Sequence, residues 1–253
     1  MQLVINFSGG KDSTALLAWV CENHPDVPKH VVMADTGWEH PDAIEWSRGI
    51  VDRFGLPLHV VRNPNKTLLS MAEKRGKFPG MQQRQCTSDL KRDPVNTWIR
   101  RNLTDPVIVS AMGLRAEESS SRAKLPMLCR DRRETNNRRT VWKWNPILHW
   151  KETEVWAYLR EREIPTHPVY KHLRRFSCRV CIYMTDHDLR AVAKHDPEAI
   201  DLVAQVEDQI GFTMFQRGGV RELVMGGSPA DPARNPSQRT SPLSLDRSLG
   251  TVP

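Results

Sequence analysis

The chain has 253 residues, of which 39% are hydrophobic and 26% charged, a balance typical of a globular protein. Because no apolar run reaches about 18 residues and the start "MQLVINF" has no basic leader, we expect neither a membrane span nor a signal peptide. The net charge of +7 favours anionic partners such as nucleotides or nucleic acid, and an odd count of five cysteines predicts a reducing, cytoplasmic location rather than a disulfide framework.

Buried apolar runs alternate with amphipathic stretches along the first 150 residues. This alternation predicts an α/β fold with a parallel sheet and right-handed crossovers. Strands are expected at 3–7, 30–35, 56–61, 106–113 and 142–150, and helices at 12–23, 42–54, 87–102 (with a break or N-terminal turn at Pro94), 151–163 and 186–211, the last as two helices joined near Pro197.

Three parts follow from this pattern. Residues 1–150 are predicted to form a nucleotide-binding α/β domain, and residues 151–225 a helical C-terminal part. Residues 226–253 are rich in Pro, Ser and Gly and poor in large apolar side chains, so we expect a disordered tail.

The stretch "FSGGKDST" (residues 7–14) joins the first expected strand to the first expected helix. It lacks the upstream glycine of a Walker A loop, so it is not the common P-loop. Free backbone N–H groups and the positive end of the helix dipole still converge there, and two glycines let a ligand approach closely. The stretch therefore predicts a phosphate-binding loop.

"SGGKDS" resembles the PP-loop of adenine nucleotide alpha hydrolases, in which ATP is cleaved between its alpha and beta phosphates. "ADTGWEHPDAIEW" (34–46), "QRQCTSDLKRDP" (83–94), "GLRAEESSSR" (113–122) and "NPILHWKETEVWAYLREREIPTHPVY" (145–170) are similar to elements of the phosphoadenosine phosphosulfate (PAPS) reductase family. The resemblance covers residues 1–185. It implies a Rossmann-like three-layer sandwich with a mostly parallel sheet.

The resemblance also implies site residues. Lys11 and Asp12 would be catalytic, together with Cys86, and Asp12 would be a partner of Mg²⁺ bound with ATP. Asp35 would face the nucleoside, although a turn or capping role stays open for it. The nucleotide-binding set would be Ser8, Gly9, Gly10, Lys11, Asp12, Ser13, Thr14, Asp35, Arg115 and Arg122, the two arginines as anion clamps or else ion-pair partners, and Lys91 a weaker candidate.

Cys178 and Cys181 form a C-x-x-C pair late in the chain, and Cys86 lies in one of the quoted elements. Three thiolates can hold a [4Fe–4S] cluster with one open iron, and Cys129 is the candidate fourth ligand, ahead of His172. Zinc, a redox pair and no metal are the alternatives. Cys21 lies on the apolar face of the first helix and reads as a buried small hydrophobe.

Reductases of this family carry a C-terminal cysteine nucleophile, whereas no cysteine follows Cys181 here. This difference favours ATP-dependent adenylation coupled to sulfur transfer, with a sulfur or electron donor protein and a tRNA or DNA acceptor held by the basic runs 129–143 and 171–179. A PAPS reductase that uses thioredoxin and a non-catalytic nucleotide-binding module are the alternatives. Proteins of this superfamily often pair, which leaves a homodimer open.

Overall fold

A six-stranded sheet in the order β3-β2-β1-β4-β6-β5 forms the centre of the protein, seen in a computed structural model that describes residues 1–176 and 178–226. All neighbouring strands are parallel except β5, which pairs antiparallel with β6. The predicted mostly parallel α/β sheet is thus confirmed. The strands are β1 (Gln2–Phe7), β2 (Lys29–Asp35), β3 (Leu58–Arg62), β4 (Val107–Met112), β5 (Leu128–Arg130) and β6 (Thr140–Trp144).

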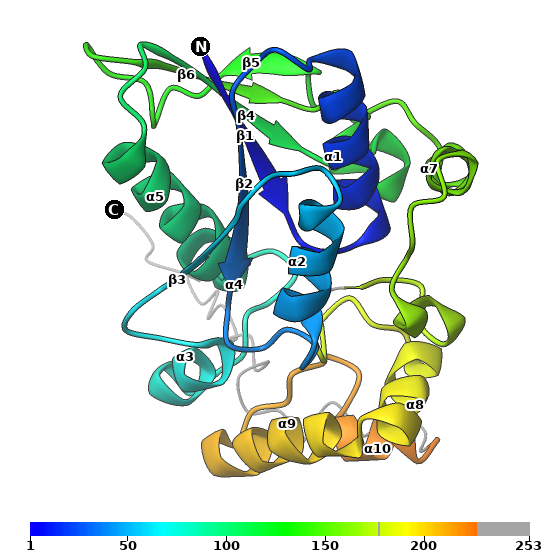
Figure 1. Ribbon diagram of the computed structural model, residues 1–253. Helices are drawn as coiled ribbons and strands as arrows, with labels where there is room; N and C mark the ends of the chain where they lie inside the picture. The colour runs from blue at the N-terminus through cyan, green and yellow to red at the C-terminus, as the bar shows by residue number, and fades with distance from the viewer. Residues whose placement is uncertain (177, 227–253) are drawn as a thin grey trace, which may run out of the picture.

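Helices cover both faces of the sheet, because successive side chains of β1 point to opposite sides. Leu3 and Ile5 pack in one apolar cluster with α1 (Lys11–Asn23) and α2 (Ala43–Asp52), whereas Val4 packs in another with α5 (Asp93–Asn102). In Figure 1, α1 and α2 lie on one side of the strands and α5 on the other. This is the expected three-layer sandwich. Helix α7 (Glu152–Glu161) packs onto the outer side of α1.

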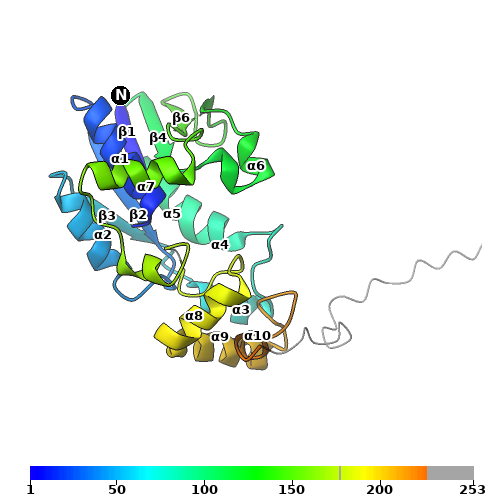
Figure 2. The same ribbon diagram turned by 90° about the vertical axis from the view of Figure 1, so that its right-hand side faces the viewer.

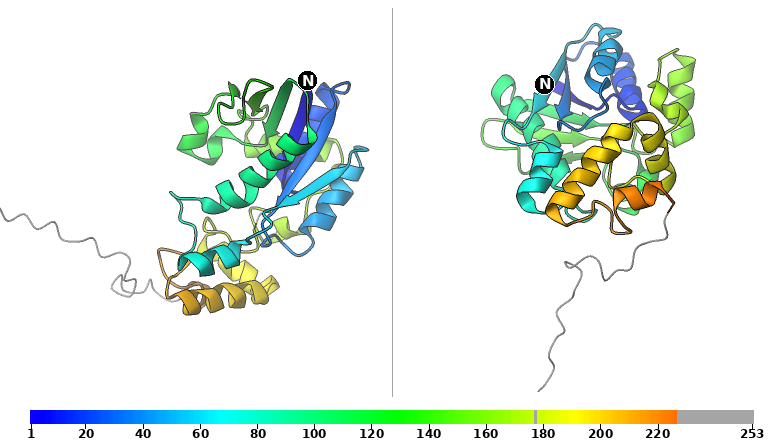
Figure 3. Two further views of the ribbon diagram at one scale, coloured as in Figure 1. Left: turned by 90° about the vertical axis from the view of Figure 1, so that its left-hand side faces the viewer. Right: turned by 90° about the horizontal axis from the view of Figure 1, so that it is seen from below.

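The remaining long helices gather below the sheet, facing the carboxyl ends of its parallel strands (Figures 1 and 3). They are α3 (Leu68–Arg75), α8 (Asp186–His195), α9 (Pro197–Ile210) and α10 (Val220–Val224). Their apolar core also includes Trp38 and Leu90 from the first half of the chain. Packing therefore crosses the boundary expected near residue 150. Beyond Gly226, the predicted tail lies outside the described residues.

Two sequence expectations need correction. The expected strand at 142–150 is β6, which ends at Trp144, because the next residues turn at Pro146, which has no N–H to donate to a ladder. The antiparallel β5 was missed, since three residues are too few to show an alternating pattern. Pro94 does lie in the first turn of α5, as predicted.

A π-helical turn, Ser88–Arg92, joins α4 (Gln85–Thr87) to α5. The break that the sequence suggested at Pro94 is this wider turn, which precedes the proline. Short helical turns complete the fold at Ala116–Glu118, Ser120–Ala123 (α6) and Pro168–Lys171. Among the described residues, no helix has the length and apolar character needed to cross a membrane.

Candidate functional site

A cleft of about 1070 Å³ opens at the carboxyl ends of β1, β2 and β4, the end of an open α/β sheet where ligands bind. Ser8 and Lys11 line it from the loop after β1, Ala34 from β2 and Met112 from β4. The α4–α5 region adds Lys91. Figure 2 shows these elements: the ends of the strands lie above α3 and α8, with α4 beside them. Nine Lys and Arg side chains line the cleft against six Asp and Glu, so it favours an anionic ligand.

The predicted phosphate loop is built as its sequence requires. Gly9 has φ +74°, and a Cβ at this position would lie 2.6 Å from Ser47 Oγ and 2.8 Å from Phe176 Cε1. Gly10 is the N-cap of α1, so the N–H groups of the first helical turn open toward the loop. Ser13 Oγ accepts from the N–H of Ser8 at 3.2 Å and donates to Gly10 O at 2.9 Å, which ties the loop to the helix.

Lys11, Asp12 and Arg115 form a charged cluster at the mouth of this loop. The Lys11 side chain is only 5% exposed; its Nζ lies 3.0 Å from Asp12 Oδ2 and 3.2 Å from Glu152 Oε1. Arg115, 3% exposed, donates from Nε to Asp12 Oδ1 at 2.6 Å. Two nearly buried cations thus flank one carboxylate beside the loop, and both can reach phosphate oxygens in the same cleft.

The other predicted nucleotide-binding residues divide into two groups. Arg122 lines the cleft and is ion-paired with Glu118. Thr14 is buried at 2% exposure and does not line the cleft. Asp35 also lies outside the cleft lining: Oδ1 accepts from Gly37 N and Oδ2 from Arg62, both at 2.7 Å. Its contact with the nucleoside stays a prediction, while the turn role left open for it is visible in these bonds.

Cys86, Cys178 and Cys181 come together from distant parts of the sequence. All three pack against the apolar core that α3, α8 and α9 share. Lys91 Nζ lies 3.7 Å from Cys178 Sγ. Burial raises the pKa of Cys178 to about 12 and also raises that of Cys86, and in both cases Lys91 opposes the shift. Both shifts favour the thiol form of Cys178 and Cys86, which releases its proton when a metal binds.

The structure does not bring the fourth-ligand candidates to these three cysteines. Cys129 lies on β5 opposite Lys143 and lines the nucleotide cleft. His172 stacks on His195 with ring centroids 3.8 Å apart. Cys21 lies on α1 and packs against the core, and burial raises its pKa, in keeping with a structural thiol.

Zinc and an iron–sulfur cluster make different demands on three sulfurs. At a tetrahedral zinc with Zn–S of about 2.3 Å, the sulfurs lie about 3.8 Å apart. Among the described residues, the group of three or more ligand atoms that all lie within 4.8 Å of one another is His40, Asp42 and His167, and it contains no cysteine. A [4Fe–4S] cluster spaces its ligands more widely, because each thiolate binds a different iron. As they stand, the three sulfurs are therefore too far apart for a single tetrahedral zinc.

The His40, Asp42 and His167 group is itself a poor metal site. His167 Nδ1 accepts from Val169 N at 3.1 Å, so its proton is on Nε2, 3.0 Å from Asp42 Oδ1. A nitrogen that carries a proton has no lone pair for a metal. Burial lowers the pKa of His167, which keeps this neutral tautomer in place.

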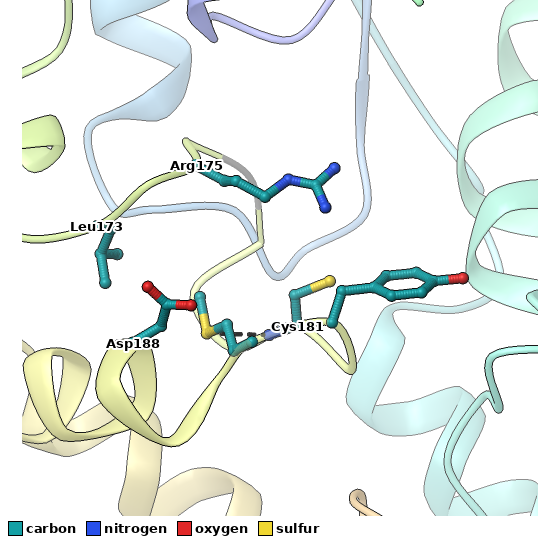
Figure 4. A pocket seen from close by; sticks show the side chains of 6 residues that line it. Leu173, Arg175, Cys181 and Asp188 are labelled. Carbon is teal, nitrogen blue, oxygen red and sulfur yellow. Dashed lines mark hydrogen bonds between the residues drawn. The ribbon is translucent and has the colours of Figure 1, made fainter. Parts of the chain in front are cut away.

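A second, much smaller cavity of about 20 Å³ lies beside Cys181 (Figure 4). Leu173, Arg175 and Asp188 also line it. Its volume suits one water molecule and not a nucleotide. The large cleft, which holds the phosphate loop, is the candidate for a nucleotide.

Three residues of the site had no assigned role from sequence. Glu39 lines the cleft and accepts from Thr36 N at 2.8 Å, and Tyr170 Oη accepts from Lys11 N at 2.8 Å. His167 supports Phe176, with ring centroids 4.2 Å apart. Tyr170 and His167 lie in the quoted 145–170 element, but nothing in their spacing shows that a segment 159 residues away contacts the phosphate loop.

Several known proteins are similar to this chain. A protein of Escherichia phage 186 described as an uncharacterized 37.8 kDa protein is 26% identical, in a match that covers 81% of this chain and 74% of that protein. A phosphoadenosine 5'-phosphosulfate reductase of Thiocapsa roseopersicina is 29% identical, in a match that covers 66% of each chain. The match to protein MJ0973 of Methanocaldococcus jannaschii spans about half of that protein, 48%.

Among solved structures, the phosphate complex of a phosphoadenylyl-sulfate reductase from Candida auris has a TM-score of 0.49 at 17% identity, over 68% of this chain and 77% of that one. The family model described as the phosphoadenosine phosphosulfate reductase domain matches residues 2–184, well over half of the sequence. The chain therefore belongs to the phosphoadenosine phosphosulfate reductase domain family.

Proposed function

We propose that this protein activates an acceptor by ATP-dependent adenylation and couples that step to sulfur transfer. One observation carries the proposal: Lys91 lines the cleft that holds the phosphate loop, and its ammonium contacts Cys178. A nucleotide-activating loop and a group of sulfur ligands thus meet at one side chain. The family itself accounts for the nucleotide-binding domain.

The first step needs stabilisation of charge on a departing pyrophosphate. An acceptor oxygen attacks the α phosphorus, and the bond to the oxygen that bridges to the β phosphorus breaks. The N–H groups at the start of α1, with Lys11 and Arg115, would bind the phosphate oxygens and the charge that develops on them. Asp12, between the two cations, is placed to take Mg²⁺ when a phosphate replaces it as their partner.

The second step needs a sulfur nucleophile. In this proposal, Cys86, Cys178 and Cys181 would hold a [4Fe–4S] cluster, which supplies an open iron able to carry sulfide. Sulfur attacks the activated atom, the bond to the adenylate oxygen breaks, and AMP leaves. Lys91, beside Cys178, would offset the negative charge of the ligand set.

The acceptor that best suits the surface is a nucleic acid. The end of β5 and its connection to β6 carry four exposed arginines, for which the described part of the chain offers no ion-pair partner: Arg130, Arg132, Arg133 and Arg138. The acids of this connection are already neutralised, since Asp131 pairs with Lys143 at 2.8 Å and Glu134 with Arg100 at 2.8 Å. Free guanidinium groups next to a cleft favour phosphate backbones.

Pyrophosphate release tests the activating step. Lys11→Ala should abolish ATP-dependent pyrophosphate release while thermal unfolding stays close to that of the wild type. Lys74→Ala is the matched control, because Lys74 is exposed on α3, away from the cleft. Release that persists in Lys11→Ala would refute the role given to the loop.

Salt dependence tests the acceptor. Binding of single-stranded DNA or tRNA by Arg132→Ala/Arg133→Ala should weaken, and its logarithmic salt slope should fall by about 1.4 to 1.8. Arg48→Ala, an exposed arginine on α2, should leave the slope unchanged. An unchanged slope in the double variant would remove nucleic acid from the proposal.

PAPS reduction is a second candidate, favoured by the 29% identity to the Thiocapsa reductase. Calorimetric titration of anaerobic protein with Mg-ATP and, separately, with PAPS separates the two. PAPS binding tighter by a factor of ten, about 1.4 kcal/mol, would favour the reductase. Tighter binding of ATP supports the activating enzyme.

A further inference from the structure

One stretch of chain, residues 167–176 (the 167–176 segment), contacts the phosphate loop at several points. Tyr170 Oη accepts from Lys11 N at 2.8 Å. A Cβ on Gly10 would lie 3.1 Å from Phe176 O and 3.3 Å from Tyr170 Oη, and one on Gly9 would lie 2.8 Å from the Phe176 ring. The segment therefore forms the wall against which the loop glycines pack.

The segment is anchored at its start. His167 is 3% exposed and stacks on Phe176 at an interplanar angle of 19°. Its Nε2 donates to Asp42, beside the N-terminus of α2. Trp156 packs edge-on against Tyr170 from α7. Tyr170 is thus held directly by α7. Phe176 is held by His167, which Asp42 at the N-cap of α2 fixes in turn.

The segment also leads directly to the cysteines. Cys178, two residues after Phe176, forms a β-bridge with Glu39 and contacts Lys91. Glu39 also accepts a hydrogen bond from Thr36 N at 2.8 Å, so the bridge joins the loop after β2 to Cys178. Phe176, which packs on the loop, and Cys178, which contacts Lys91, are therefore only two positions apart in the sequence.

The N–H of Lys11 has two competing acceptors. It belongs to the first turn of α1, whose N–H groups face an oxyanion, and it now donates to Tyr170. One N–H makes one good hydrogen bond, so a phosphate oxygen that takes it displaces the Tyr170 hydroxyl. We propose that Tyr170 is a positioning residue that couples occupancy of the phosphate loop to the environment of Cys178, so that nucleotide binding changes the reactivity of that thiol.

This coupling rests on the proposed function only for the identity of the ligand. The reduced full-length protein is alkylated with iodoacetamide, and the rate at each cysteine is read by peptide mass spectrometry. Mg-ATP, PAPS and inorganic pyrophosphate are the ligands, and calorimetry measures the binding of each. A ligand that binds should change the rate at Cys178 by at least about fivefold and leave Cys21 within twofold.

Tyr170→Phe removes the hydroxyl alone. It should bind the ligand at least as tightly, because Lys11 N loses its internal partner, and the change at Cys178 should fall below twofold. Tyr158→Phe is the matched control: its hydroxyl donates to Glu22 on the far side of α1, so its coupling should equal that of the wild type. Should Tyr170→Phe unfold early, Phe176→Leu removes the wall contact and should weaken the coupling in the same way.

Binding without any change at Cys178, or equal coupling in Tyr170→Phe and wild type, would overturn this inference and leave the proposed function intact. Binding of PAPS and not ATP, with coupling present, would overturn the activating function and keep the inference. Failure of all three ligands to bind would refute both.

Discussion

The phosphate loop lines the cleft, and the cysteine group contacts Lys91, which lines the same cleft, but the two regions are assembled in opposite ways. The loop comes from one continuous stretch, residues 7–14, fixed by a strand, two glycines and a helix start. The cysteines come from residues 86 and 178–181 and meet only because α3, α8 and α9 share a core with them. The residues of the loop are encoded in one stretch, whereas the cysteine group exists only through packing between distant segments.

The largest effect is expected where an added atom pushes against the start of α1. Gly113, after β4, backs the start of α1: a Cβ there would lie 2.8 Å from Asp12 O and 3.1 Å from Ser13 N. Because these are backbone atoms, Gly113→Ala must displace the helix start, and ATP should bind about tenfold to a hundredfold more weakly by calorimetry.

The control is Gly49→Ala, on α2, where an added Cβ meets nothing within 4 Å. Alanine favours a helix interior, so thermal unfolding should show a gain of about 0.5–1 kcal/mol and ATP affinity should not change. Equal affinity in both glycine variants would show that the loop tolerates displacement.

The cysteine group should fail independently of the loop. Cys178→Ser removes the sulfur that Lys91 contacts, so after anaerobic reconstitution with iron and sulfide the bound iron should fall about tenfold or more. Cys21→Ser should retain iron, and Cys129→Ser decides whether Cys129 is the fourth ligand. ATP affinity of Cys178→Ser measures how separate the two regions are. Full iron retention in Cys178→Ser would contradict the ligand assignment.

The smallest effect concerns the chain between the two C-terminal cysteines. Arg179 donates two hydrogen bonds, of 2.8 and 2.6 Å, to the carboxylate of Asp196, and these bonds lower the pKa of Asp196. A carboxyl with a lowered folded pKa adds stability above its unfolded pKa and loses it as the pH falls through the folded value. Asp196→Asn should cost about 1–2 kcal/mol in urea unfolding at pH 7.

As the pH falls through the lowered folded pKa of Asp196, the wild type should approach the variant, because the carboxylate then becomes protonated. The difference between the two proteins isolates Asp196 from other carboxylates with lowered pKa, such as Asp42 and Asp89. A difference that stays constant from pH 7 to pH 3 would exclude an ionic contribution.

The sequence predicted what is encoded locally. The strand, loop and helix from 2 to 23 and the two helices that meet at Pro197 were predicted from the spacing of apolar residues and from the glycines and proline between them. The structure confirms them. The three-residue β5 and the π-helical turn at Ser88–Arg92 leave no such pattern. Contacts between distant segments, such as Tyr170 with Lys11, are set by packing and could not be read from spacing.

The π-helical turn has a consequence for how this protein tolerates insertions and deletions. It holds one residue more than an α-helical turn, and it separates Cys86 from the rigid α5. Because the wider turn already takes up one extra residue, deleting one residue between 88 and 92 would let the segment become continuous α-helix with little rotation of Cys86 relative to α5. A second deletion there would turn Cys86 by about 100°, and the sulfur would face away from Cys178 and Cys181 although no residue of the site had been altered. The π-helical turn therefore gives the chain between Cys86 and Pro94 tolerance for one deletion and no more.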